Sequence, residues 1–139
     1  MKAHIVILCL LAGGRIQAHH ADSMTTARLC ALADIETGCC DQPKHTRDLS
    51  RYGISRPVWR EYTSLPFSAA TNPVTAGAVS TLILADRCEA FRQKQHREPS
   101  EAEIYCLWFR PAFVGHMTTS QRDKAERFAN LVKLYLKTN

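Results

Sequence analysis

The sequence lacks the patterns that mark repeat, low-complexity and sheet-rich proteins. It has no internal repeat, no low-complexity segment and a single long apolar run, residues 5–12. The apolar–polar alternation of half-buried strands is nearly absent. The expected fold class is therefore mainly α, with an irregular loop or a short β-hairpin after the first helix.

Metal-binding motifs are also missing. The chain has no Cys-x-x-Cys or His-x-x-x-His spacing, so we expect no metal and no cofactor. A site built from Cys39, Cys40 and His45 is the alternative. The histidines are scattered, without a local signature of Ser-His-Asp or Cys-His catalysis, which leaves a pair such as Cys40 and His116 as a minor possibility.

The first 18 residues have the pattern of a secretory signal peptide. A short positive start precedes an apolar run of roughly eight residues, far fewer than the about 20 needed to span a bilayer. Residues 19–139 then form one domain, which we expect to be secreted or periplasmic, monomeric and without a membrane span.

Loss of Lys2 and Arg15 with the signal peptide lowers the net charge from +5 to about +3 (5 − 2). This basic balance suits an anionic polymer such as a cell wall, and we expect no nucleic-acid partner.

Five cysteines remain in the expected mature chain, and an odd number leaves at least one thiol free or paired between chains. Cys39 and Cys40 are adjacent, and a bridge between neighbours is sterically poor. We therefore expect one or both to reach Cys30, Cys88 or Cys106, with the connectivity left open.

Capping signals predict where the helices begin and end. The first helix spans residues 24–36, has Asp22 or Ser23 as its cap and stops at Gly38. A short helix is expected over residues 57–62, a long one from Asn72-Pro73 to about Gln93, one from the Ser100-x-x-Glu103 capping box to before Pro111, and a last one from Ser120. The residues that we expect the long helix to bury are Val79, Leu82, Ile83 and Phe91.

Glu36 carries the strongest chemical signal. It ends the first helix on the apolar stripe that includes Leu29, Leu32 and Ala33. Partial burial raises the pKa of a carboxylic acid and keeps its proton available at neutral pH, as a general acid needs. The alternative is an ordinary exposed residue in the last helical turn.

Glycoside hydrolysis usually needs a second carboxylate. The turn at residues 51–55 can bring Asp48 opposite Glu36, whereas Asp41 is expected to face solvent. A turn-capping role is the alternative for Asp48.

Four further residues are expected to bind substrate: Tyr52, Ser55, Trp108 and Arg110. Tyr52 and Ser55 follow the polar loop, whereas Trp108 and Arg110 come just before Pro111 ends a helix. Core packing is the alternative for Tyr52 and Trp108. Trp59 is expected to be a core anchor, with sugar stacking as a secondary role.

Four motifs in order resemble the lysozyme superfamily, over roughly residues 26–115. They are Ile35-Glu36-Thr37-Gly38, where the family shows Glu-Ser-Gly; Leu49 to Ser55 with Trp59, where it shows a Gly-x-Tyr/Met-Gln-Ile turn; Asn72-Pro73; and Tyr105 to Trp108. The chain is most similar to invertebrate-type lysozymes and soluble lytic transglycosylase-like domains. It departs from them at Gly53, where many relatives carry Gln, and at residues 108–111, where an Asn-Gly-Gly signature is missing.

The resemblance implies cleavage of β-1,4 bonds in peptidoglycan or a related amino-sugar polymer, chitin included. Glu36 falls on the family's catalytic acid, and Asp48 falls near the second carboxylate of invertebrate-type members. Hydrolysis would use both residues, whereas a lytic transglycosylase would use Glu36 alone. A non-catalytic glycan-binding or structural module with the same fold is the alternative function, and a disulfide-stapled protein binder is a third.

Overall fold

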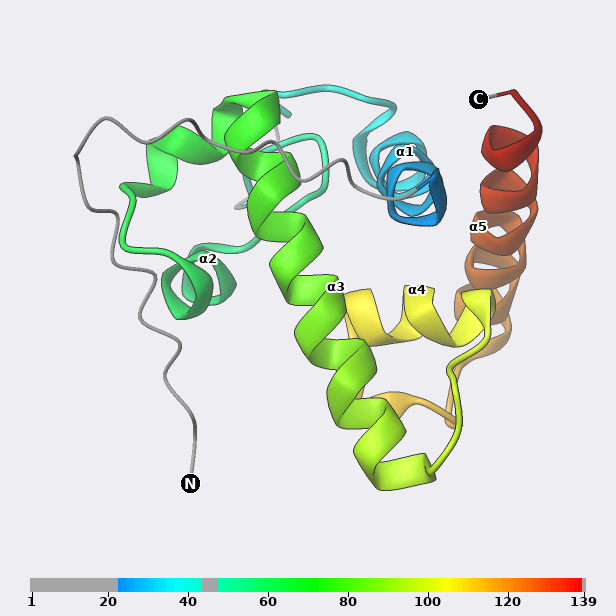
Figure 1. Cartoon of the computed structure of the whole chain (residues 1–139). Helices are drawn as coiled ribbons and strands as arrows, with labels where there is room; N and C mark the ends of the chain where they lie inside the picture. The colour runs from blue at the N-terminus through cyan, green and yellow to red at the C-terminus, as the bar shows by residue number, and fades with distance from the viewer. Residues whose placement is uncertain (1–22, 44–47, 139) are drawn as a thin grey trace.

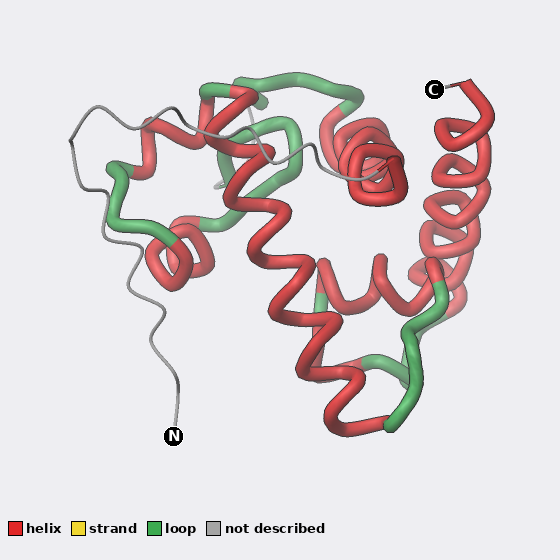
Figure 2. Tube along the Cα trace, viewed as in Figure 1, coloured by secondary structure: helices red, strands yellow, loops and turns green. Residues whose placement is uncertain are grey.

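A computed structural model of the chain describes residues 23–43 and 48–138, which form a mainly helical protein, as predicted (Figure 1). Figure 2 shows these helices joined by loops and turns. The expected signal peptide and the Asp22 cap lie outside the described residues. The elements are α1 (Ser23–Thr37), α2 (Arg56–Tyr62), the 3₁₀-helix η1 (Phe67–Thr71), α3 (Pro73–Gln95), α4 (Glu101–Phe109), the 3₁₀-helix η2 (Pro111–Phe113) and α5 (Thr119–Thr138).

Two helices begin at the caps expected from the sequence. The Asn72 side chain accepts hydrogen bonds from the backbone N–H groups of Val74 and Thr75 at the start of α3. At the start of α4, Ser100 and Glu103 form a capping box, with each side chain bonded to the other's backbone N–H. These contacts satisfy N–H groups that lack a partner in the first helical turn.

The last helix starts one residue earlier than the sequence predicts, at Thr119. The Thr118 hydroxyl accepts a hydrogen bond from the Gln121 N–H, and the Gln121 amide oxygen accepts one from the Thr118 N–H. Because this reciprocal pair caps the first turn, Ser120 lies inside the helix.

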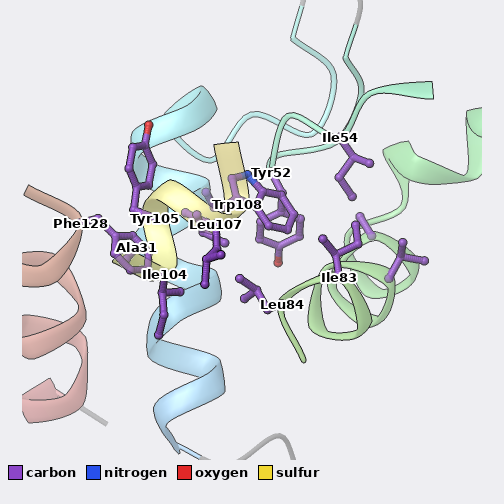
Figure 3. Close-up of a cluster of buried hydrophobic side chains, with 14 of the residues drawn as sticks. Ala31, Tyr52, Ile54, Ile83, Leu84, Ile104, Tyr105, Leu107, Trp108 and Phe128 are labelled. Carbon is purple, nitrogen blue, oxygen red and sulfur yellow. The ribbon is translucent and has the colours of Figure 1, made fainter. Parts of the chain in front are cut away.

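The core lies between the long helix α3 and the helices around it (Figure 1). Helix α4 contacts both α3 and α5, and α1 packs against α5 and α3. Figure 3 shows how side chains from α1, α3, α4, α5 and the segment before α2 meet in this core. The largest fully buried side chains are Trp59, Phe128, Leu32, Ile54, Ile83, Ile104 and Val132.

The structure corrects one expectation about the core. Val79, Ile83 and Phe91 are buried as predicted, but Leu82 is 39% exposed. Leu82 directly precedes Ile83, and a helical step of about 100° turns its side chain away from the stripe that faces the core.

The predicted disulfides are not formed among the described residues. Cys30, Cys39, Cys40, Cys88 and Cys106 are all free thiols. Cys39 and Cys40 are exposed after the end of α1, whereas Cys88 and Cys106 are buried. The bridges expected from the cysteine count are therefore wrong for this structure.

Across residues 23–43 and 48–138, none of the helices combines the length and the apolar character that a bilayer crossing requires.

Candidate functional site

Glu36 stands in the last turn of α1, where the chain leaves the helix sharply. Gly38 and Cys39 both have positive φ, at 60° and 65°. The Gly38 N–H donates to the Asp34 carbonyl at 3.1 Å, and the Cys39 N–H donates to the Ala33 carbonyl at 2.9 Å. The left-handed turn thus satisfies carbonyls at the helix end, as a glycine at this position allows.

A tight turn folds back against this helix end. Leu49 and Ile54 exchange two backbone hydrogen bonds of 3.0 and 2.9 Å, which form an isolated antiparallel bridge in place of a regular hairpin. The Thr37 hydroxyl donates to the Arg51 carbonyl at 2.7 Å and joins the turn to α1. The turn is thereby fixed beside Glu36.

Gly53 is the point of closest approach between this turn and Glu36. Its φ is +63°, and a β-carbon there would lie 3.4 Å from Glu36 Oε2. A side chain at this position would be strained by the backbone conformation and would touch the carboxylate. Glycine is therefore well suited to both the turn and the approach.

A pocket of about 170 Å³ opens at Glu36. Its walls come from the end of α1, the residues before α2, α2 itself, α3 and the end of α4. The lining residues are Glu36, Asp48, Gly53, Ile54, Ser55, Val58, Ile83, Arg87, Trp108 and Phe109.

Burial raises the pKa of the Glu36 carboxyl above its usual range, because a charged carboxylate is poorly solvated there. The hydrogen bond from Tyr105 and the charge of Lys124 act in the opposite direction, whereas the negative charge of Asp48 raises the pKa further. Tyr105 Oη donates to Glu36 Oε1 at 3.0 Å. The balance favours a carboxyl that holds its proton more tightly than an exposed glutamate.

Asp48 lines the same pocket as Glu36, so the structure brings together the two carboxylates selected from the sequence. Asp41 is engaged elsewhere, since Arg51 donates to both of its oxygens at 2.7 and 3.0 Å. This pairing lowers the pKa of Asp41 and leaves its side chain 34% exposed. Asp41 therefore lies at the surface and is partly exposed to solvent, as expected, while Arg51 holds its carboxylate.

The four predicted substrate contacts divide into two pairs. Ser55 and Trp108 line the pocket. Tyr52 is outside this lining and only 7% exposed, because it lies in the core, where a β-carbon on Gly77 would be 3.5 Å from its hydroxyl. Arg110 follows the end of α4 and lines a separate small hollow, with its guanidinium 5.6 Å from the ring centre of Phe109.

Three residues at or behind the pocket wall, Tyr105, Arg87 and Phe109, were not selected from the sequence as site residues. Tyr105 has one weak signal, since it precedes Trp108 by three residues and so shares its helix face. Arg87 has a stronger one, because it follows buried Ile83 by four residues and is a charged residue on an apolar stripe. Phe109 is 51% exposed at the end of α4 and has no comparable signal.

Tyr105→Phe tests the link between Tyr105 and the carboxyl. Removing the hydroxyl takes away a hydrogen bond that favours the charged form of Glu36, so we expect the pKa of Glu36 to rise further. A carboxyl-detected NMR titration of Glu36 measures this shift. Tyr135→Phe is the matched control, because its hydroxyl donates to Asp34 at 3.2 Å instead. An unchanged Glu36 titration in Tyr105→Phe would contradict the assigned contact.

Within residues 23–43 and 48–138, no three His, Cys, Asp or Glu side chains are grouped closely enough to hold a metal ion. His45, part of the alternative metal site, lies outside the described residues. Comparisons of the chain with protein-family models, curated proteins and solved structures found no match.

Proposed function

We propose that the chain is an exported glycan-cleaving enzyme of lysozyme type. Its substrate is peptidoglycan or a related amino-sugar polymer, and it cleaves β-1,4 bonds with Glu36 as general acid and base. The observation that carries the proposal is the half-buried Glu36 carboxyl, which opens into a pocket and has a raised pKa. The sequence motifs around Glu36 resemble those of lysozymes, and this resemblance is the reason for proposing a glycan as the substrate.

Glu36 has the properties that the first chemical step requires. A protonated carboxyl donates its proton to the glycosidic oxygen as the bond to the sugar C1 breaks. A carboxyl with a raised pKa is protonated over a wider range of pH. After the step Glu36 is a carboxylate, which can take a proton from the incoming nucleophile.

Asp48 decides between two forms of the second step. In hydrolysis its carboxylate stabilises positive charge at the sugar or orients a water, and the water oxygen bonds to C1 while Glu36 takes its proton. In an intramolecular transfer, a hydroxyl of the same sugar attacks C1 and forms a 1,6-anhydro product. Glu36 alone serves as acid and then base in that route. The shared pocket of Glu36 and Asp48 supports hydrolysis.

Mass spectrometry of purified peptidoglycan after incubation with the protein tests the proposal and separates the two routes. Hydrolysis gives muropeptides with new reducing ends, whereas intramolecular transfer gives anhydro ends. We expect reducing ends, and a rate loss of at least about 100-fold in Asp48→Asn. Asp123→Asn, an exposed change on α5, is the matched control. A modest effect of Asp48→Asn together with anhydro products would assign the transglycosylase route.

A non-catalytic glycan-binding module is the second candidate. Gly53 supports it, because no side chain at that position contacts a substrate beside Glu36. Wall fragments that bind without any new chain ends would favour this function over cleavage.

A further inference from the structure

Arg87 brings a positive charge into the pocket that holds two carboxylates. Glu36 and Asp48 come from the end of α1 and the turn that follows, whereas Arg87 comes from α3. The Arg87 side chain is half-buried. Among the described lining residues it is the only cationic one. Arg87 therefore places a positive charge on the side of the pocket that α3 forms.

The contacts of Arg87 hold the guanidinium in place without neutralising it. Nη1 donates to the Leu107 carbonyl at 3.0 Å and to the Trp108 carbonyl, both near the end of α4. The guanidinium also lies 6.0 Å from the ring centre of Trp108. Carbonyl oxygens carry only partial charge, so the formal positive charge of Arg87 remains.

Carboxylates in the described part of the chain do not pair with Arg87. None of them lies within the 4.0 Å of an ion pair. The neighbouring Asp86 instead accepts a hydrogen bond of 2.6 Å from the Tyr62 hydroxyl. Both recorded hydrogen bonds of Arg87 leave from Nη1, whereas a guanidinium has five N–H donors. Within the described residues, Nε and Nη2 make no hydrogen bond, so their N–H groups can donate to a ligand.

This arrangement matches the chemistry of an acidic sugar. An acidic substituent that enters a pocket lined by the carboxyl groups of Glu36 and Asp48 is favoured there when a cation such as Arg87 is within reach. A guanidinium suits a carboxylate because its N–H groups bind both oxygens, and a partly buried site strengthens the pair. A neutral polymer gains nothing comparable from Arg87.

We propose that Arg87 binds a carboxylate carried on the sugar, so that the site prefers an acidic amino-sugar polymer such as peptidoglycan over neutral chitin. The inference rests on the proposed glycan-binding function of the Glu36 pocket and names the substrate class of that site. It makes Arg87 a specificity-determining residue. A purely structural role, in which Arg87 only holds the end of α4, predicts no dependence on ligand charge.

Calorimetric titration of the full chain carrying Glu36→Gln measures this preference without turnover. The three probes are a tetrasaccharide of alternating N-acetylglucosamine and N-acetylmuramic acid, the same tetrasaccharide with its lactyl carboxylates converted to methylamides, and chitotetraose. We expect the free acid to bind about tenfold more tightly than the methylamide. The preference should shrink as salt is raised, because salt screens the pair.

The Arg87 variants test whether this residue is the source of the preference. Arg87→Gln should abolish the difference in affinity between the free acid and the methylamide. Arg87→Lys keeps the charge but not the planar fork, so it should keep part of the preference.

The possible outcomes separate this inference from the proposed function. Equal affinity for free acid and methylamide in the Arg87-containing protein would overturn the inference and leave glycan binding standing. That comparison needs no Arg87 variant, so it does not depend on how well the variants fold. Equal weakening of all three probes by Arg87→Gln would also overturn it, since it would show a structural role. Binding of none of the probes would count against the proposed function itself.

Discussion

Glu36→Gln is expected to lower the rate of glycan cleavage by about 100- to 10,000-fold, the usual contribution of a general acid or base. Glutamine has nearly the same shape as protonated glutamate, but it cannot donate a proton to the glycosidic oxygen. The Tyr105 hydroxyl, which now bonds to Glu36 Oε1 at 3.0 Å, can still donate to an amide oxygen. Release of soluble fragments from purified peptidoglycan measures the rate.

The same change should stabilise the fold at neutral pH. Burial raises the pKa of Glu36 in the folded protein, so the folded state binds this proton more tightly than the unfolded chain does. Stability linked to Glu36 is therefore fully present below the pKa of the unfolded chain and lost as pH rises through the raised pKa. We expect Glu36→Gln to have a higher Tm than the unchanged protein above that range, with the difference disappearing in acid.

Glu126→Gln is the matched control for both measurements, because Glu126 is exposed on α5. It should leave the cleavage rate and the pH dependence of Tm unchanged. Full activity in Glu36→Gln would exclude both the hydrolase and the transglycosylase mechanism. If the Tm difference between Glu36→Gln and the unchanged protein did not disappear in acid, the burial of the Glu36 carboxyl would be contradicted.

The sequence predicts the helices well because the signals that start and stop them are local. Asn72, the pair Ser100 and Glu103, and Gly38 each act on backbone groups within a few residues. Such contacts depend little on the rest of the fold. The position of Glu36 near a helix end follows from the same local pattern.

The make-up of the pocket is harder to predict because it depends on contacts far apart in the chain. Tyr105 and Glu36 are 69 residues apart, and Arg87 bonds to carbonyls about 20 residues later. Tyr52 and Arg110 show the same dependence on distant contacts. Each is near the pocket in sequence, yet Tyr52 points into the core and Arg110 lies over Phe109. Spacing along the sequence does not determine whether such a side chain faces the pocket or another part of the structure.

Trp59→Ala is expected to lower the free energy of unfolding by about 3 to 5 kcal/mol, the usual effect of removing a buried aromatic side chain. Trp59 is 0% exposed and lies edge-on to Phe67, with ring centres 6.2 Å apart. Its indole N–H donates to the Leu65 carbonyl at 2.9 Å. A loss of this size is a large part of the roughly 5 to 15 kcal/mol that stabilises most proteins. Urea denaturation followed by circular dichroism measures it.

Two controls show whether Trp59 acts through the core or through a sugar. Trp59→Phe keeps most of the buried ring and should lose less than Trp59→Ala, whereas Phe109→Ala removes a ring that is 51% exposed and should change stability by about 0.5 kcal/mol or less. Ser55 and Val58, at and near the start of the same helix, line the pocket, so the loss of Trp59 should also weaken glycan binding through the fold. A Trp59→Ala protein that kept its stability but lost glycan binding would assign Trp59 to the sugar instead.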